Sequence, residues 1–172
     1  MAEASAQHAW LNTYPSFLDW NMDIANGTLP QLWDDAVSKF GDRPYMEFLG
    51  NGLTFAQTDA LIDKAAAGLQ KMGVAQGDRV GLFLPNCIYF PVFYYAILKL
   101  GGIVVNFNPT YPADQVEKLT EQAGVKRIIT TDLQAVYPNV GPVFEKSRAN
   151  GGALQNLIIC PFAGSLSGLT AI

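Results

Sequence analysis

Short apolar runs alternate with longer amphipathic stretches along most of the chain. The runs rich in β-branched residues are predicted strands, at 79–84, 103–107, 127–131 and 157–159. Helical patterns fill the intervals at 87–100, 113–123 and, more weakly, 135–148. This alternation is typical of right-handed crossovers, so we expect an α/β fold with a doubly wound, mostly parallel sheet flanked by helices. The apolar runs also predict strands that are buried on both faces.

A helix and a small hairpin are expected before the first of these strands. Leu32, Trp33, Ala36, Val37 and Phe40 have helical spacing, which predicts a helix over 29–40. The extended segments 43–49 and 53–54 flank Gly50-Asn51-Gly52. Asn-Gly readily adopts the positive φ angles of a two-residue turn, so it predicts an antiparallel hairpin that turns at Asn51 and Gly52.

The next helix has clear start and stop signals. Gln57 lies three residues after Thr54, which is the spacing of a capping box, so the helix is expected to begin at Thr54. Gly73 is expected to end it. Its predicted apolar face consists of Leu61, Ala65, Leu69 and Met72.

The longest uncharged apolar run, 87–98, is too short to span a membrane, which takes roughly 20 residues. It predicts a helix that is buried on nearly all sides, with Asn86 as its N-cap and Pro91 in its first turn. Gly101 and Gly102 follow it. We expect one of them to need a positive φ angle or a close backbone approach.

The two ends of the chain lack periodic patterns. Residues 1–28 are predicted to form an extended N-terminal arm along the surface of the α/β body, which covers 29–160. Residues 161–172 have no closing element and are interpreted as a truncated tail or linker. The pattern therefore predicts a partial domain of a larger protein. Residues 1–10 contain neither a basic residue nor an apolar run, so we expect no secretory signal.

Composition agrees with one cytoplasmic domain. The chain has 172 residues, of which 49% are hydrophobic and 15% charged, enough for one core. A formal net charge of −4 without a basic run argues against nucleic-acid binding. Cys87 and Cys160 match no metal-ligand spacing, so we expect reduced, buried thiols.

Candidate chemistry is sparse. The chain contains neither the dinucleotide-binding nor the phosphate-loop fingerprint, and its single histidine, His8, excludes a His-based triad. No catalytic, cofactor-binding or metal-binding residue is therefore assigned. Cys87 could have a lowered pKa at a helix N-terminus, but a small packed residue is the favoured interpretation.

One loop is a candidate for contact with a ligand or with a missing part of the protein. Asn106, Asn108 and Tyr111 follow a strand expected to be central, and open α/β sheets bind ligands at the carboxyl ends of their strands. The alternative is that these residues serve only turn formation and packing.

An ordered set of segments resembles the N-terminal part of the adenylate-forming acyl-CoA synthetases. These are Phe40-Gly-Asp-Arg-Pro, Leu53-Thr-Phe, Gly73 to Val80, Leu84-Pro-Asn, Asn108-Pro-Thr-Tyr and Ala123-Gly-Val-Lys. The resemblance runs from about Leu29 to Asp132. In addition, Trp10-Leu-x-x-Tyr-Pro resembles the opening of bacterial long-chain fatty-acid-CoA ligases. Relatives usually have a Glu-Leu pair where this chain has Gln115-Val116, so a contact made by that Glu is not carried over.

The resemblance implies a much longer parent enzyme, a cytoplasmic acid-thiol ligase. It would adenylate a fatty acid with ATP and Mg²⁺ and then transfer the acyl group to coenzyme A. The family's phosphate-gripping segment follows the region matched here, so this part is expected to bind no cofactor, to be inactive alone and to act as a scaffold. Its partners would be the remainder of its polypeptide and, in the full enzyme, the fatty acid. Peripheral membrane contact of the full enzyme and a homodimer are left open. The alternative is a free-standing α/β interaction or dimerisation module without catalysis.

Overall fold

A four-stranded parallel sheet forms the centre of the computed structural model, which describes residues 9–24 and 26–166. Its strands are β3 (Arg79–Leu82), β4 (Ile103–Asn106), β5 (Arg127–Thr131) and β6 (Asn156–Cys160), in the spatial order β4-β3-β5-β6. Every neighbouring pair is parallel. The predicted strands and their parallel arrangement are therefore confirmed.

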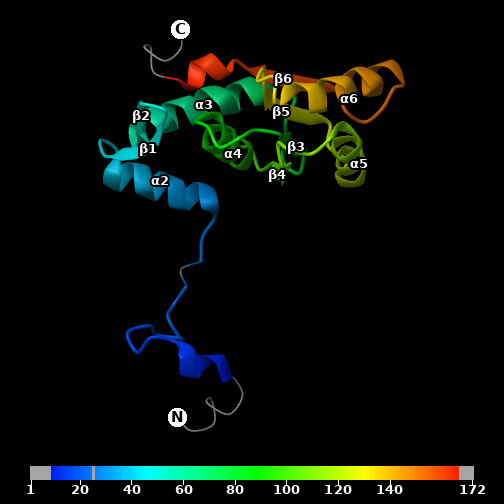
Figure 1. The fold of residues 1–172 in the computed structure, drawn as a ribbon. Coiled ribbons are helices and arrows are strands. Elements are labelled where there is room, and N and C mark those ends of the chain that lie inside the picture. The colour runs from blue at the N-terminus through cyan, green and yellow to red at the C-terminus, as the bar shows by residue number, and fades with distance from the viewer. Residues whose placement is uncertain (1–8, 25, 167–172) are drawn as a thin grey trace.

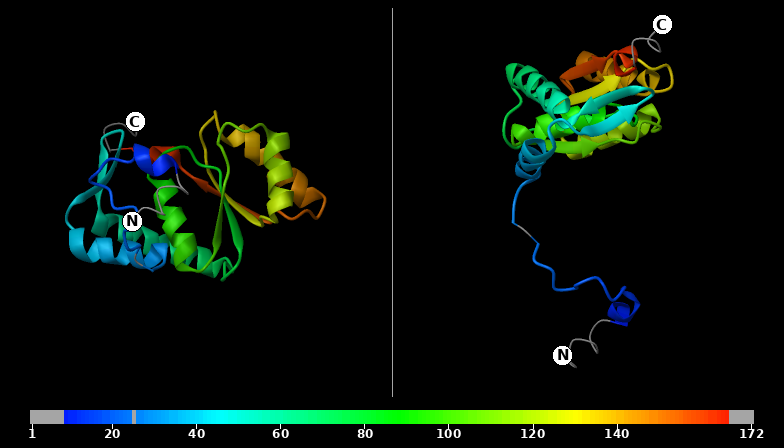
Figure 2. Two further views of the ribbon diagram at one scale, coloured as in Figure 1. Left: turned by 90° about the horizontal axis from the view of Figure 1, so that it is seen from below. Right: turned by 90° about the vertical axis from the view of Figure 1, so that its left-hand side faces the viewer.

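Helices cover both faces of this sheet, as the doubly wound prediction requires. Three helices lie on one side, α2 (Leu29–Phe40), α3 (Phe55–Lys71) and α4 (Tyr89–Lys99), and two on the other, α5 (Ala113–Ala123) and α6 (Tyr137–Ala149). Figure 2, left, shows the strands between α4 and the α5–α6 pair. Because β4 and β5 lie on opposite sides of β3, their two connections pass over opposite faces.

Side chains that alternate along the strands build a separate core on each face. Val80, Leu82 and Ile129 pack with α3 and α4. Phe83 and Ile128 point the other way and pack with α5 and α6. The alternation assigns each apolar strand residue to one core, so a shift of one residue in the register would exchange the two cores.

Burial on both faces, predicted for all strands, holds only for the middle of the sheet. All five residues of β5 are buried, as are the last three of β3. The edge strands are more open, because Ile103 in β4 and Ile159 in β6 keep 45% and 46% of their surface exposed. An edge strand can therefore have an apolar sequence although this part of the chain does not cover both of its faces.

A two-stranded hairpin of β1 (Pro44–Phe48) and β2 (Asn51–Thr54) lies beside α2, as predicted. Its turn is at Leu49 and Gly50, which have φ angles of 49° and 81°, so the prediction of a turn at Asn51 and Gly52 is wrong. Phe48 pairs with Asn51, and an irregularity falls between Pro44 and Met46. The irregularity lets the adjacent Tyr45 and Met46 both pack on the core. It lies at the end of the hairpin away from the turn, whose position follows from the pairing of Phe48 with Asn51.

The starts of α2 and α3 follow the capping rules closely. Thr54 caps α3 in a capping box with Gln57, as predicted, and Thr28 and Gln31 form the same box at α2. The predicted apolar face of α3 is displaced by one position, since the buried residues are Thr58, Ile62, Ala66 and Leu69. Thr58 can be buried because its hydroxyl donates to the Thr54 carbonyl at 2.8 Å.

The apolar helix α4 departs from its prediction at the start. Ile88, not Asn86, is at the N-cap position, and it makes no side-chain capping bond. Asn86 lies in an exposed bend instead. Pro91 does fall in the first turn. Only Val92, Ala96 and Ile97 are fully buried, so the helix has an open side and is not surrounded on nearly all sides.

Gly101 adopts a φ angle of +71° directly after α4, which confirms the predicted need for a special glycine. The neighbouring Gly102 is crowded in a different way, because a Cβ there would lie 2.8 Å from Ile97 Cγ2. Both glycines are thus required, one by its dihedral angle and the other by space.

Valine at Gly101 is expected to lower the free energy of unfolding by more than about 1 kcal/mol, because a β-branched residue is poorly accommodated at positive φ. Urea unfolding followed by circular dichroism measures the loss. Gly52→Val is the matched control, since a Cβ at Gly52 meets nothing within 4 Å. Equal midpoints for both variants would contradict the assignment.

The described arm residues lead away from the α/β body, so the predicted path along its surface is wrong (Figure 1). They include the short 3₁₀ helix η1 (Ala9–Thr13). The rings of Tyr14 and Trp20 meet edge to face at 5.4 Å. Phe17 is 83% exposed. The arm therefore packs mainly on itself.

Among residues 9–24 and 26–166, every helix is too short or too polar to cross a lipid bilayer.

Candidate functional site

The carboxyl edge of the sheet is the first place to search for a site. In an open α/β sheet, ligands bind where neighbouring connections leave in opposite directions. Here the chain passes from β3 to β4 on one side and then returns to β5 on the other. The switch point is therefore between the carboxyl ends of β3 and β5.

The chain itself covers much of this edge. Residues 161–165, which we call the edge segment, follow β6 and contain the 3₁₀ helix η2 (Phe162–Ser165). The Phe162 amide donates to Asp132 Oδ1 at 2.7 Å, directly after β5. The Tyr89 hydroxyl donates to the Pro161 carbonyl at 2.9 Å. Ser165 is fully buried. Asp132 and Tyr89 thus bind the edge segment at this side of the sheet.

Both cysteines lie under the edge segment as free, buried thiols, as predicted. Burial raises the pKa of the Cys160 thiol to about 12, and the neighbouring Cys87 thiol and Asp132 carboxylate add to the increase. Burial also raises the pKa of Cys87 and outweighs the main-chain hydrogen bonds near the start of α4. The pKa of Tyr89 is raised by burial and then by the two thiols. Nucleophilic chemistry at Cys87 is disfavoured, which agrees with the interpretation of a packed residue.

Alkylation by iodoacetamide at pH 8 is expected to be at least about 100-fold slower in the folded chain than in urea, because a buried thiol with a raised pKa supplies little thiolate. The measurement is mass spectrometry of the alkylated chain over time. Since the folded pKa exceeds the unfolded one, folding should also weaken above about pH 9, where only the unfolded thiol ionises. A thiol that reacts equally fast in the folded and unfolded chain would refute this expectation.

Asn108 and Tyr111 lie in the loop after β4, and Asn106 is the last residue of that strand, at the edge of the described sheet. The strand before this loop, β4, is the outermost described strand, so its prediction as a central strand is wrong. The Asn108 side chain accepts hydrogen bonds from the Thr110 amide and hydroxyl at 3.0 and 2.8 Å. Tyr111 packs against the core beside α5, and Asn106 is exposed. Asn108 and Tyr111 thus have local structural roles, and contact with a ligand stays a prediction.

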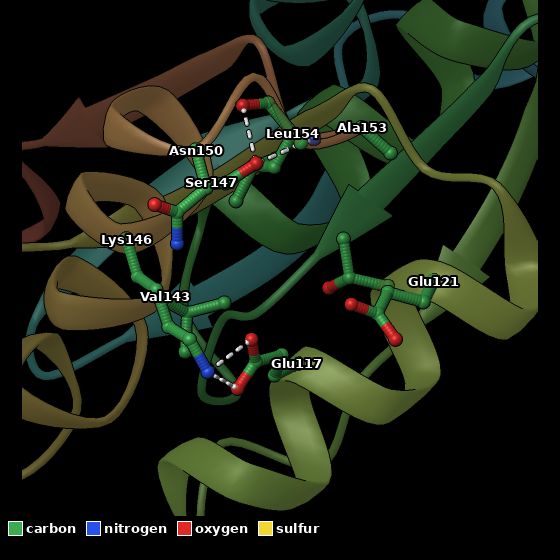
Figure 3. A pocket seen from close by; sticks show the side chains of 10 residues that line it. Glu117, Glu121, Val143, Lys146, Ser147, Asn150, Ala153 and Leu154 are labelled. Carbon is green, nitrogen blue, oxygen red and sulfur yellow. Dashed lines mark hydrogen bonds and ion pairs between the residues drawn. The ribbon is translucent and has the colours of Figure 1, made fainter.

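A cleft of about 300 Å³ lies between α5 and α6 (Figure 3). Lys146 Nζ is 2.7 Å from Glu117 Oε1 across its mouth, and this partner raises the pKa of Lys146. Ser147 Oγ donates to the Leu154 carbonyl at 3.1 Å and accepts from the Leu154 amide at 3.0 Å. Lys146, Glu117 and Ser147 thus already have partners within the protein. The Lys146–Glu117 pair links α6 to α5, which fits a role in stabilising the packing of the two helices.

Arg127 is a buried cation whose structural role the sequence analysis missed. It begins β5, and its Nη2 donates to the Met72 carbonyl at the end of α3 at 2.8 Å. Its Nη1 lies 3.7 Å from Asp78 Oδ2. The only sequence signal was an Arg at the start of an apolar run. Arg127 links the amino end of the sheet to α3 and is remote from the switch point.

No group of three or more potential metal ligands occurs among the described residues. His8 lies outside the described residues. The assignment of no catalytic, cofactor-binding or metal-binding residue therefore stays a prediction.

The chain is similar to known proteins of one enzyme family. The family model for AMP-binding enzymes matches residues 33–159. A long-chain-fatty-acid–CoA ligase from Bacillus subtilis is 41% identical over 130 residues, which are 74% of this chain and 23% of that protein. A ligase of the same name from Escherichia coli is 29% identical over 160 residues, or 92% of this chain and 27% of that protein. The chain thus spans about a quarter of the length of these relatives.

Solved structures show the same fold. A long-chain-fatty-acid-CoA ligase from Archaeoglobus fulgidus superimposes with a TM-score of 0.69 at 22% identity, covering 81% of this chain and 28% of that one. A fatty acyl CoA synthetase from Mycobacterium tuberculosis gives a TM-score of 0.64 at 25% identity, covering 76% and 26%. The α/β body is therefore an arrangement found within larger enzymes.

Proposed function

Because the chain belongs to the AMP-binding enzyme family, we propose that it is the N-terminal part of a fatty-acid-CoA ligase. The observation that carries the proposal is the 41% identity to the Bacillus subtilis ligase over most of this chain. The parent enzyme would join a fatty acid to coenzyme A through an acyl-adenylate. ATP, Mg²⁺ and coenzyme A are its proposed cofactors and co-substrates.

The described residues of this part act as a scaffold in the proposal. Catalysis of adenylation needs positioned charges around the phosphates and the acyl carboxylate. The described body has no metal-ligand cluster, and its carboxyl edge is occupied by the edge segment. Residues 29–160 form the scaffold, with residues 1–28 as an arm and 161–172 as the link to the remainder of the polypeptide, its main partner. We further propose that the enzyme is cytoplasmic, with peripheral membrane contact left open.

The isolated chain is expected to fold but not to catalyse. A coupled assay with oleate, ATP, Mg²⁺ and coenzyme A should stay at the level of a boiled control, because the groups that hold the phosphates lie elsewhere in the proposed enzyme. The enzyme encoded by the complete gene should form oleoyl-CoA and AMP in equal amounts. Turnover by the isolated chain, after host ligase has been excluded, would refute the scaffold role. No turnover by the complete enzyme with fatty acids of any length would refute the ligase.

The alternative is a free-standing interaction or dimerisation module. The observation in its favour is the exposure of apolar side chains at separate places, on α2 (Leu29 and Leu32) and on the two edge strands (Ile103 and Ile159). Sedimentation velocity over a range of concentrations would reveal a homodimer. A stable dimer from a gene that ends at Ile172 would favour the module, whereas weak, nonspecific self-association is expected from an uncovered scaffold.

A further inference from the structure

Side chains from three separate elements hold the edge segment. Asp132, after β5, accepts from the Phe162 amide at 2.7 Å. Tyr89, at the start of α4, donates to the Pro161 carbonyl at 2.9 Å. Asn51, in β2, donates through Nδ2 to the Ser165 carbonyl at 3.2 Å. Each bond reaches a main-chain atom of the edge segment, so the three bonds act on its backbone directly.

Between these hydrogen bonds, the edge segment also packs closely against Phe48 and Tyr89. The rings of Phe48 and Phe162 meet edge to face at 5.8 Å. Gly164 passes so close to Tyr89 that a Cβ there would lie 2.4 Å from the tyrosine oxygen. Ser165 is fully buried. The segment is therefore held at its beginning and end by hydrogen bonds, and in its middle by close contact with Tyr89.

The location of this contact gives it a functional meaning. The edge segment follows the last strand of the described sheet and lies against Tyr89, which begins the helix after β3, and against Asp132, which directly follows β5, so it is close to the switch point. We infer that Asn51, Tyr89 and Asp132 are positioning residues that direct the polypeptide as it leaves the sheet, so that the following part of the enzyme is set against the carboxyl edge. This inference rests on the proposed ligase function.

Asp132 has the clearest test, because one replacement keeps the hydrogen-bond acceptor without its charge and another removes the acceptor. Asp132→Asn keeps Oδ1 as an acceptor for the Phe162 amide, whereas Asp132→Ala removes it. In the 172-residue chain, amide hydrogen exchange at Phe162 should be at least about tenfold faster in Asp132→Ala and close to the parent in Asp132→Asn. Asp35→Ala, which changes an exposed aspartate on α2, is the matched control and should leave this exchange rate unchanged.

The second measurement uses the complete enzyme and its steady-state kinetics. A small displacement of the groups that align the reactants lowers kcat, even when the substituted residue is far from the reaction. Asp132→Ala and Tyr89→Phe should therefore each reduce kcat about tenfold, with KM for the fatty acid changed less than about twofold. Asp132→Asn should retain most of the activity. Tyr89→Phe keeps the ring and removes only the donor, so it tests the inference even if Asp132→Ala fails to fold.

The outcomes separate this inference from the proposed function. An active enzyme in which Asp132→Ala and Tyr89→Phe match the parent in kcat would overturn the inference and leave the ligase proposal standing. Equal losses in Asp132→Asn and Asp132→Ala would also overturn it, because the acceptor would then not be the cause. An inactive parent enzyme would refute the ligase function, while rapid Phe162 exchange in the unmodified chain would independently overturn the positioning role.

Discussion

Replacing Trp33 by alanine is expected to lower the free energy of unfolding by about 4 kcal/mol, the largest loss at any single side chain of the α/β body. Trp33 is only 4% exposed and is the centre of an aromatic cluster. Its ring centroid lies 4.9 Å from that of Tyr45, 5.7 Å from Phe55 and 4.6 Å from Tyr95. These rings come from β1, α3 and α4, so one deletion loosens the packing of the hairpin and three helices.

The polar edge of the indole adds to this loss. Trp33 Nε1 donates to Asp59 Oδ1 at 2.9 Å, and alanine would leave that contact unmade. Equilibrium urea unfolding, followed by circular dichroism, measures the effect. Trp33→Phe should recover about half of the loss, since it restores ring packing but not the donor. Trp20→Ala in the arm is the control and should change the free energy by less than about 0.5 kcal/mol. A similar small effect at Trp33 would contradict the assigned core.

Gly81→Val is expected to cost about 3 kcal/mol, because it overpacks the middle of the sheet. A Cβ at this position would lie 2.7 Å from Phe107 Cε2 and 2.9 Å from Ile128 Cγ1. Both neighbours are buried, so neither can move into solvent. Gly81 is on β3 between β4 and β5, where a displaced backbone would also disturb both ladders.

A second-site change tests the cause of that loss. Phe107→Leu removes ring atoms from the crowded side, so the double variant should be more stable than the sum of the two single losses predicts, by at least about 1 kcal/mol. Gly68→Val in α3 is the matched control, because a Cβ there meets nothing within 4 Å. Strict additivity of Gly81→Val and Phe107→Leu would mean that the steric account is wrong.

Local signals predicted most elements of this fold. Thr54 and Gln57 marked the start of α3 because a capping box depends on residues only three positions apart. The bounds of α5 matched because apolar periodicity and the left-handed Gly124 at its end agree. Each of these features depends on residues that lie within one or two helical turns of one another, so the local sequence is sufficient to predict it.

The failures share a non-local cause. Asn51-Gly52 has the stronger turn propensity, but Phe48 pairs with Asn51 across the strands, and this pairing puts the turn at Leu49 and Gly50. Similarly, the strand before Asn108 was predicted to be central, whereas spatial order puts β4 at the edge. The order of the strands depends on the direction in which each crossover connection runs across the sheet. No local sequence pattern determines that direction.

The candidate site illustrates the same limit. The sequence drew attention to the carboxyl ends of the strands, where residues 161–165 in fact close the edge through Asp132, Tyr89 and Asn51. The partners in these bonds are 30, 72 and 114 positions apart in the chain. Isolated polar residues at such separations form no motif, so only the folded arrangement brings them together.

The sequence of the parent gene beyond the codon for Ile172 tests the central claim most directly. If the chain is the N-terminal part of a fatty-acid-CoA ligase, the reading frame continues and encodes the family's phosphate-gripping segment and the further domains of a protein more than three times as long, as the partial coverage of its relatives predicts. A stop codon directly after Ile172 would contradict the claim.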